Sequence, residues 1–391
     1  MKYAVVCTFF LFCFVSVAQS QHKAKTYLFI GSYTGGKPDR GIYVYDFNRK
    51  SGRLEALGAA YDVVNPSFIT LSPNGQYLYA CADTQLPDTG SVMAFKVDSV
   101  SGILGFINKQ PSGGDNPVYV SVDRSNKYLI NANYTGGSVS AYTLNSDGSL
   151  NPYVQKIPFE GSSVMAKRQE SAHIHAAVYS PQCDYVFLPD LGADIIRVFK
   201  FDPSKAQPLI PTVANDVHTV PGSGPRHFTF HPNGQFAYSI EELSGTVVAY
   251  AYHAGTLDSL QRIFGYSKAQ ASSYGGADIH ISPDGRFLYS SNRWEDENTI
   301  AMFGIDQQTG MLKLLGHQKT YGDHPRNFTI DPTGKFLLVA NMLTNNVIVF
   351  KRNMKTGLLK KTKTEITVPS PSCLQMRSYI KGHGARSKER K

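Results

Sequence analysis

The segment from Gly224 to Tyr250 places side chains for acid–base chemistry within an apolar, alternating pattern. Arg226 and His227 open one predicted strand and Glu242 follows the next, with the turn sequence HPNG between them. Asn and Gly tolerate the positive φ of a hairpin turn. Because one strand's start and its antiparallel neighbour's end share a sheet edge, we expect these three side chains to meet at one rim. His or Glu can move protons there, while Arg can hold an anion or a developing oxyanion.

A repeat of about 50 residues organises most of the chain. Each repeat reads as a short strand, a tight turn, a second strand, a polar loop and a third strand, and most repeats add a fourth strand. The turns begin at Ser72, Asp123, Ser180, His231, Ser282 and Asp331. Four antiparallel strands per unit, repeated in this way, are typical of a β-propeller.

The fold class predicted is therefore all-β, a seven-bladed β-propeller. Six blades come from the repeats, and N- and C-terminal strands together form the seventh, which closes the ring and removes free sheet edges. Six blades plus an N-terminal hairpin is the alternative. The expected domains are a signal peptide over 1–20, the propeller over 25–377, and a basic, disordered tail over 378–391.

The N-terminus has the pattern of a secretory signal peptide. Lys2 precedes an apolar run that is short for a membrane span, and small-x-small cleavage sites follow. We expect an exported protein, periplasmic or extracellular, with no membrane association after cleavage; a retained N-terminal anchor is the alternative. Cys81, Cys183 and Cys373 would remain, and we expect all three to be buried in strands.

Part of the net charge of +9 comes from the basic C-terminal tail. The sequence contains no nucleic-acid-binding motif. The expected partner is a small anionic lactone or sugar acid rather than nucleic acid, and the expected state is a monomer.

Polar residues recur at equivalent places in neighbouring blades, beside the first strand or at the end of the second. Asn65, Asn116 and Asn341 suit turn starts and are expected to be structural. No metal-ligand spacing or nucleophile elbow occurs, so we predict a metal-free acid–base site that opens or closes a lactone. Its members are His175, Arg226, His227, Glu242, His280, Arg293 and Arg326.

Three stretches carry a family resemblance: GPRHFTFHPNGQFAYSIEEL, ADIHISPDGRFLYSSNR and HPRNFTIDPTGKFLLVANMLTNNVIVF. From Tyr27 to Met376 the chain resembles the seven-bladed propeller lactonases, which include bacterial 6-phosphogluconolactonase and fungal carboxymuconate-lactonizing enzyme. The resemblance implies a carboxylic-ester hydrolase of carbohydrate metabolism with no metal and no organic cofactor.

The resemblance also implies roles for the rim residues. The catalytic set would be His175, Glu242, Arg226 and Arg293, and the substrate-binding set would be His227, His280 and Arg326. Either His175 or Glu242 would activate water at the lactone carbonyl, and alanine at either is expected to reduce turnover strongly with little effect on thermal stability.

The export signal separates this chain from a cytosolic lactonase of phosphorylated sugars. Either the substrate is an extracytoplasmic sugar lactone, or the family name is narrower than the activities of its members; the substrate expected is a sugar lactone of the 6-phosphogluconolactone type. Two other functions remain open: a cycloisomerase that runs in the lactone-forming direction, and a non-catalytic, ligand-binding propeller.

Overall fold

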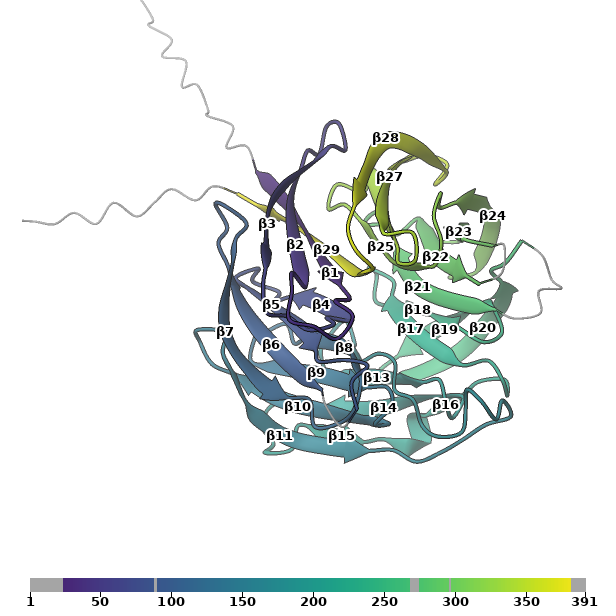
Figure 1. Cartoon of the computed structure of the whole chain (residues 1–391). Coiled ribbons are helices and arrows are strands. Elements are labelled where there is room, and N and C mark those ends of the chain that lie inside the picture. The colour runs from purple at the N-terminus through teal and green to yellow at the C-terminus, as the bar shows by residue number, and fades with distance from the viewer. Residues whose placement is uncertain (1–23, 88–89, 268–273, 295–296, 381–391) are drawn as a thin grey trace, which may run out of the picture.

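Seven antiparallel sheets surround a central opening in the computed structural model, which describes residues 24–87, 90–267, 274–294 and 297–380 (Figure 1). Each sheet is a path of four hydrogen-bonded strands, and the third sheet has an additional strand, β16, paired with β14. The predicted seven-bladed propeller is confirmed.

The blades are numbered here in chain order from the first complete repeat. Blade 1 consists of β4 (Phe68–Leu71), β5 (Tyr77–Ala82), β6 (Ser91–Val97) and β7 (Leu104–Pro111). Blade 2 consists of β8 (Pro117–Val122), β9 (Tyr128–Asn133), β10 (Ser138–Leu144) and β11 (Leu150–Pro158). Blade 3 consists of β12 (Val178–Tyr179), β13 (Tyr185–Asp190), β14 (Ile195–Phe201), β15 (Leu209–Pro211), the 3-10 helix η1 (Val213–Asn215) and β16 (Val217–His218).

The remaining blades complete the ring. Blade 4 consists of β17 (Pro225–Phe230), β18 (Phe236–Glu241), β19 (Thr246–His253) and β20 (Thr256–Phe264). Blade 5 consists of β21 (Gly275–Ile281), β22 (Phe287–Arg293), β23 (Thr299–Ile305) and β24 (Leu312–Lys319). Blade 6 consists of β25 (Pro325–Ile330), β26 (Phe336–Asn341), β27 (Asn346–Arg352) and β28 (Leu359–Thr367). Blade 7 consists of β29 (Pro371–Tyr379), β1 (Lys25–Ser32), β2 (Ile42–Phe47) and β3 (Leu54–Ala60).

Blade 7 joins the two ends of the chain, as expected. Strand β29 pairs antiparallel with β1, with Lys25 opposite Tyr379. This pairing extends two residues past the expected end of the propeller at 377, so Ser378 and Tyr379 belong to β29 rather than to the tail. The remainder of the predicted tail from 381, and the predicted signal peptide over 1–20, lie outside the described residues.

The turn between the first and second strands has the same backbone shape in blades 1 to 6. Its fourth position has a positive φ of 58° to 74° and is occupied by Gly75, Asn126, Cys183, Gly234, Gly285 and Gly334. Cys183 is therefore a half-buried turn residue, which corrects the prediction that it lies in a strand; the local sequence SPQCDY fills the glycine position of the other turns. Cys81 and Cys373 are buried in β5 and β29, and all three thiols are free.

The hydrophobic core lies between neighbouring blades. For example, Tyr238 and Ile240 of β18 pack with Leu288 of β22 and Phe303 of β23 in one buried cluster. These apolar contacts hold adjacent sheets together. The ends of the inner strands are not needed for this packing and can therefore carry polar side chains. Within the described ranges, no helix is long and apolar enough to cross a membrane.

Candidate active site

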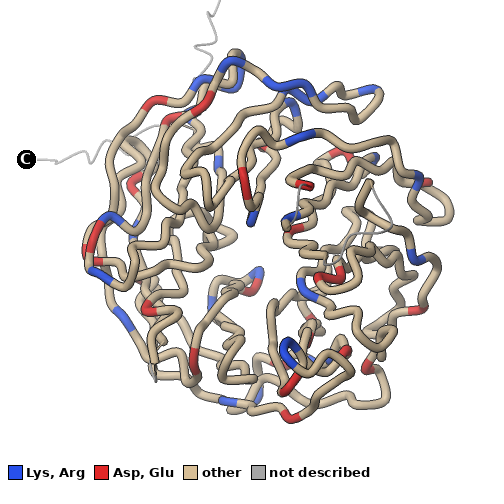
Figure 2. Tube along the Cα trace, turned by 45° about the vertical axis from the view of Figure 1, so that its right-hand side comes forward, with Lys and Arg blue, Asp and Glu red and all other residues tan. Residues whose placement is uncertain are grey.

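Acidic and basic positions border the central opening of the ring (Figure 2). At the end of the ring opposite the repeated turns, here called the rim, the starts of the inner strands meet the ends of the second strands. Glu242 lies there, directly after β18, and 5% of its side chain is exposed. Its Oε1 accepts a hydrogen bond from Arg168 Nη2 at 2.6 Å. Its Oε2 lies 2.8 Å from Arg226 Nε and 3.1 Å from Arg293 Nη2. One buried carboxylate thus holds three guanidinium groups.

A β-bulge sets the direction of Arg226. The pairing of β17 with β18 shifts between Pro225 and His227, which leaves Arg226 as the extra residue. The pairing of β25 with β26 shifts in the same way at Arg326. Bulges redirect side chains and are common beside functional sites. The arginine side chain of Arg226 is 1% exposed, and its Nε meets Glu242 as an ion pair rather than as an aligned hydrogen bond.

The arginine charges decide the ionisation of Glu242. Burial by itself would raise the pKa of this carboxyl, but the charges of Arg293, Arg226 and Arg168 outweigh it and lower the pKa to about 2. Burial, with Arg293 nearby, lowers the pKa of Arg226 to about 9. At neutral pH the carboxylate is ionised and Arg226 is still charged, so the cluster has excess positive charge.

His175 lies next to this cluster in a different state. Its side chain is buried, and its Nδ1 has no hydrogen-bond partner among the described residues. Its ring centroid lies 5.4 Å from that of Tyr134 and 5.2 Å from that of His227. Burial, followed by the charge of Arg226, holds the pKa of His175 well below its usual value. His175 is therefore neutral at pH 7 and can accept a proton.

Farther along the channel, Asp278 bridges two histidines. Its Oδ1 lies 2.8 Å from His227 Nδ1, and its Oδ2 lies 2.9 Å from His280 Nε2. These three residues line a cavity of about 290 Å³ that also includes Phe68 and Tyr119 of the inner strands.

Comparison with known proteins identifies the family of the chain. Residues 27–376 match the family model described as "Lactonase, 7-bladed beta-propeller". The chain belongs to this family. It is 47% identical over 352 residues to the 6-phosphogluconolactonase of Formosa agariphila, covering 90% of this chain and 99% of that protein.

Two solved structures share both the fold and substantial sequence identity. The periplasmic gluconolactonase PpgL of Pseudomonas aeruginosa aligns with a TM-score of 0.86 and 35% identity, covering 91% of this chain and 99% of that chain. A Bacteroides fragilis protein, described as a candidate 6-phosphogluconolactonase, aligns with a TM-score of 0.86 and 36% identity, covering 92% of this chain and 99% of that chain.

The residues predicted for the site fall into two groups in this family member. His175, Arg226, Glu242 and Arg293 gather at the rim as expected from the sequence. His280 instead bonds to Asp278, deeper in the channel, because it lies two residues farther along β21.

The remaining predicted residues, His227, Arg326 and Asn65, each make different contacts. His227 bridges the two groups, with its Nε2 3.3 Å from Arg226 Nη1. Arg326 is half-buried and stacks over the ring of Tyr33 at 5.5 Å. Asn65 has a structural role, as expected, since its Oδ1 accepts the backbone N–H of Thr34 at 2.9 Å.

The sequence analysis missed several members of the site. Arg168 comes from the long loop before β12, and a loop without periodicity gives no phase by which to place it. The first strand of blade 3 is regular only at Val178–Tyr179, so His175 lies just before β12 and not within it. Two further members lie in or beside the first strand of a blade. Asp278 is in β21, and His324 directly precedes β25, with its Nε2 3.2 Å from Arg293 Nη1. The charge of the first and the imidazole of the second are the signals by which the sequence could have indicated them.

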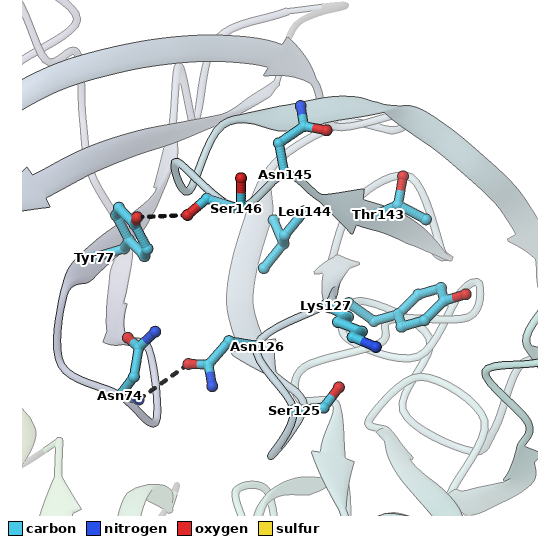
Figure 3. Close-up of a pocket in the computed structure, with 10 residues that line it drawn as sticks. Asn74, Tyr77, Ser125, Asn126, Lys127, Thr143, Leu144, Asn145 and Ser146 are labelled. Carbon is cyan, nitrogen blue, oxygen red and sulfur yellow. Dashed lines mark hydrogen bonds between the residues drawn. The ribbon is translucent and has the colours of Figure 1, made fainter.

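A larger cavity, of about 480 Å³, lies at the turn ends of blades 1 and 2 (Figure 3). Its lining is mainly amide and hydroxyl groups, with Lys127 as its charged residue, and Asn126 accepts a hydrogen bond from the backbone of Asn74. Since it contains neither a carboxylate nor a histidine, it is not a candidate for acid–base chemistry.

Within the described part of the chain, no group of three or more His, Cys, Asp or Glu residues is placed to hold a metal ion. Asp278, His227 and His280 have the residue types of a metal site. However, the ring nitrogens of His227 and His280 that face Asp278 are hydrogen-bonded to its carboxylate. These atoms therefore do not converge on a common point.

Proposed function

We propose that this protein is a metal-independent lactonase that hydrolyses a sugar lactone of the 6-phosphogluconolactone type. The observation that carries the proposal is a neutral, buried His175 beside a carboxylate that holds three arginines. Relatives named 6-phosphogluconolactonase and gluconolactonase, at 35% to 47% identity, support the same reaction class.

In the proposed reaction, His175 takes a proton from water as the water oxygen attacks the lactone carbonyl. The guanidinium groups of Arg226 and Arg293 face the negative charge that develops on the carbonyl oxygen. The ring C–O bond then breaks, and the proton held by His175 passes to the departing alkoxide. The product is the open-chain acid, and atoms and charge balance with one water consumed.

Glu242 is the weaker candidate for the base. The charges of Arg293, Arg226 and Arg168 stabilise its ionised form and lower its pKa to about 2, so it accepts a proton only weakly. Its two oxygens are also occupied by guanidinium groups. We assign to Glu242 the role of holding Arg226 and Arg293 in place.

The surplus of positive charge favours an anionic substrate. Arg168 and Arg326 are more exposed than Arg226 and would contact a phosphate or carboxylate group on the sugar. His227 would act through Arg226. His280 would contact a substrate only if part of it enters the 290 Å³ cavity.

We also propose export of the protein, with residues 1–20 as a cleaved signal peptide, on the basis of the sequence pattern. The similarity to a periplasmic gluconolactonase supports this location. Export makes an unphosphorylated sugar lactone a second candidate substrate beside the phosphorylated one. The monomeric state stays a prediction.

The test is hydrolysis of a lactone panel by the purified mature protein in the presence of chelator. The panel consists of gluconolactone, 6-phosphogluconolactone and a carboxymuconolactone, each measured against spontaneous opening. Acceleration with one of the sugar lactones supports the proposal and identifies the substrate. Acceleration with the carboxymuconolactone alone would assign the cycloisomerase branch, and no acceleration at all would leave a ligand-binding propeller.

Trp294 provides an independent measure of binding. It is the single tryptophan of the chain, it is 45% exposed, and its ring lies 5.9 Å from the Arg293 guanidinium. Titration with the non-reactive product acids, gluconate and 6-phosphogluconate, should change its fluorescence if these anions bind at the rim. An unchanged signal with both acids, together with no hydrolysis, would overturn the proposed site.

A further inference from the structure

The carboxylate of Asp278 is the centre of a buried hydrogen-bond network next to the rim. Asp278 lies on β21 and is 2% exposed. Its two oxygens accept five hydrogen bonds, from the side chains of His227, His280 and Asn327 and from the backbone N–H groups of Ile279 and Phe328. A buried carboxylate with this many donors is held in one orientation.

The surroundings of Asp278 require it to be an acceptor only. The amide of Asn327 is fixed with its NH₂ toward Asp278, because its Oδ1 accepts the backbone N–H of Leu374 at 2.7 Å. Burial opposes ionisation of Asp278, but the charge of His280 and the histidine hydrogen bonds hold the pKa of this carboxyl below its usual range. An ionised carboxylate has no proton to give. The proton in the 2.8 Å contact with His227 is therefore on Nδ1 of the imidazole.

This placement of the proton determines what the other side of the His227 ring can do. Burial, followed by the charge of Arg226, lowers the pKa of His227 to about 4, so the ring is neutral at pH 7. Its Nε2 then carries a lone pair, and Arg226 Nη1, 3.3 Å away, can donate to it. The same Nη1 donates to the carbonyl oxygen of Ala277, the residue before Asp278. With the opposite tautomer, two N–H groups would face each other and Arg226 would lose this acceptor.

We propose that Asp278 is a positioning residue for the reaction: it fixes His227 as the Nδ1–H tautomer, and the lone pair on His227 Nε2 holds the Arg226 guanidinium against Glu242. The proposal rests on the proposed function, since it treats Arg226 as a group that faces the substrate. The side chain of Asp278 makes no hydrogen bond to Glu242 or Arg226, so its hydrogen-bonded route to Arg226 runs through His227, while its charge also favours the protonated form of Arg226.

The variant Asp278→Asn separates this role from general support of the fold. The carboxamide can still accept from Asn327, Phe328 and His280 with its oxygen, but its NH₂ then faces His227 and also the backbone N–H of Ile279, which loses its acceptor. His227 Nδ1 becomes the acceptor, and its proton moves to Nε2, opposite Arg226. We expect kcat/KM for the lactone to fall by about 10- to 100-fold, the range typical when a group that orients a functional residue is lost.

The decisive readout is the ¹⁵N NMR spectrum of histidine-labelled protein, with the His227 signals assigned from the variant His227→Gln. The wild type should show His227 as the Nδ1–H tautomer at pH 7, and Asp278→Asn should show the Nε2–H tautomer. A wild-type His227 in the Nε2–H form would overturn the proposal, even if Asp278→Asn does not fold. An unchanged tautomer with unchanged kcat/KM in folded Asp278→Asn would also overturn it.

A double-mutant cycle provides the kinetic test. Glutamine at 227 carries one donor and one acceptor and can turn its amide to suit either residue at 278. The double variant Asp278→Asn/His227→Gln should therefore have the same kcat/KM as His227→Gln alone, whereas independent effects would multiply.

The matched control is Asp331→Asn. Asp331 is also a buried carboxylate that accepts a backbone hydrogen bond, from Phe336 at 2.7 Å, but it lies at the turn end of blade 6. This variant should leave both the His227 tautomer and kcat/KM unchanged. If the wild type hydrolyses no lactone, the proposed function fails, while the tautomer and the product affinity measured by Trp294 fluorescence still decide the role of Asp278.

Discussion

The two ends of the inner strands use buried histidine in opposite ways. At the turn end, the Nε2 of His231 is 2.8 Å from the carbonyl oxygen of Gly285, and its Nδ1 accepts the backbone N–H of Asn233 at 3.2 Å. At the rim, His175 is equally buried, but its Nδ1 has no partner among the described residues and arginine charges surround it. A histidine whose two nitrogens are satisfied by backbone is part of the scaffold. One with an unpaired nitrogen among cations is available for proton transfer.

The difference extends to the neighbouring residues. At the turn end, the side chains that begin the turns bond mainly to backbone, as Ser72 does with Tyr77 of its own blade and His231 with Gly285 of the next blade. At the rim, Glu242 instead joins side chains from several segments, including Arg293 of blade 5. The repeated residues therefore stabilise the scaffold, whereas the candidate catalytic residues are side chains at the rim that differ from blade to blade.

The largest expected combined effect on activity and stability at the rim comes from Glu242→Gln. Without the carboxylate charge, Arg226 and Arg293 repel each other and leave their positions, so kcat/KM should fall by about 10³-fold. The free energy of unfolding should also fall by about 3–5 kcal/mol, since buried arginines lose their ion pair. Kinetics and urea unfolding of the same preparation measure both losses.

This prediction differs from the expectation from sequence that removing Glu242 would hardly affect stability, because the structure pairs this carboxylate with Arg168, Arg226 and Arg293. Glu241→Gln is the adjacent comparison, because Glu241 pairs with Arg262 on its own blade. If both variants lose kcat/KM equally, the difference between the rim and the scaffold disappears.

A smaller effect is expected from Arg168→Ala. The side chain of Arg168 is 36% exposed and reaches Glu242 from the loop, so its loss should raise KM by about tenfold and change kcat little. Arg197→Ala is the control, since Arg197 pairs with Asp190 outside the Glu242 cluster. A fall in kcat with unchanged KM would show that Arg168 acts on the chemical step.

The pH profile should be flat where an ordinary histidine titrates. A base with the usual histidine pKa of about 6.5 would lose about tenfold in kcat/KM between pH 7.5 and 5.5. His175 has a pKa well below that value, so its neutral form persists to lower pH and kcat/KM should fall much less than tenfold over this range. A tenfold loss over the same interval, measured against spontaneous lactone opening, would contradict the assignment of His175 as the base.

The smallest effect is expected at the turn end, from Cys183→Gly. Cys183 has a φ of 58°, a conformation that costs a residue with a Cβ about 1–2 kcal/mol. Glycine removes this cost, but its greater conformational entropy in the unfolded state lowers the free energy of unfolding by a similar amount. Stability should therefore rise by less than about 1 kcal/mol, and kcat/KM should be unchanged. A loss of activity would place function at the turn end and weaken the comparison.

The sequence predicts the scaffold well because the scaffold is periodic. Equivalent turns at regular intervals determine the number of blades, and the antiparallel order then brings Arg226 and Glu242 to one rim. The contacts between blades are less accessible from sequence. Arg168 comes from a loop with no repeat, and the bond between His227 and Asp278 depends on a side-chain direction that the strand pattern alone does not determine.

The most direct test of the central claim compares His175→Gln with His231→Gln. Both replace a buried histidine with the same amide, one at the rim and one at the turn end, so general effects of the substitution are matched. We predict that kcat/KM for the sugar lactone falls by about 10²- to 10⁴-fold in His175→Gln and stays at the wild-type value in His231→Gln. Equal activity of the two folded variants would contradict the claim that the rim is the active site and that His175 is its base.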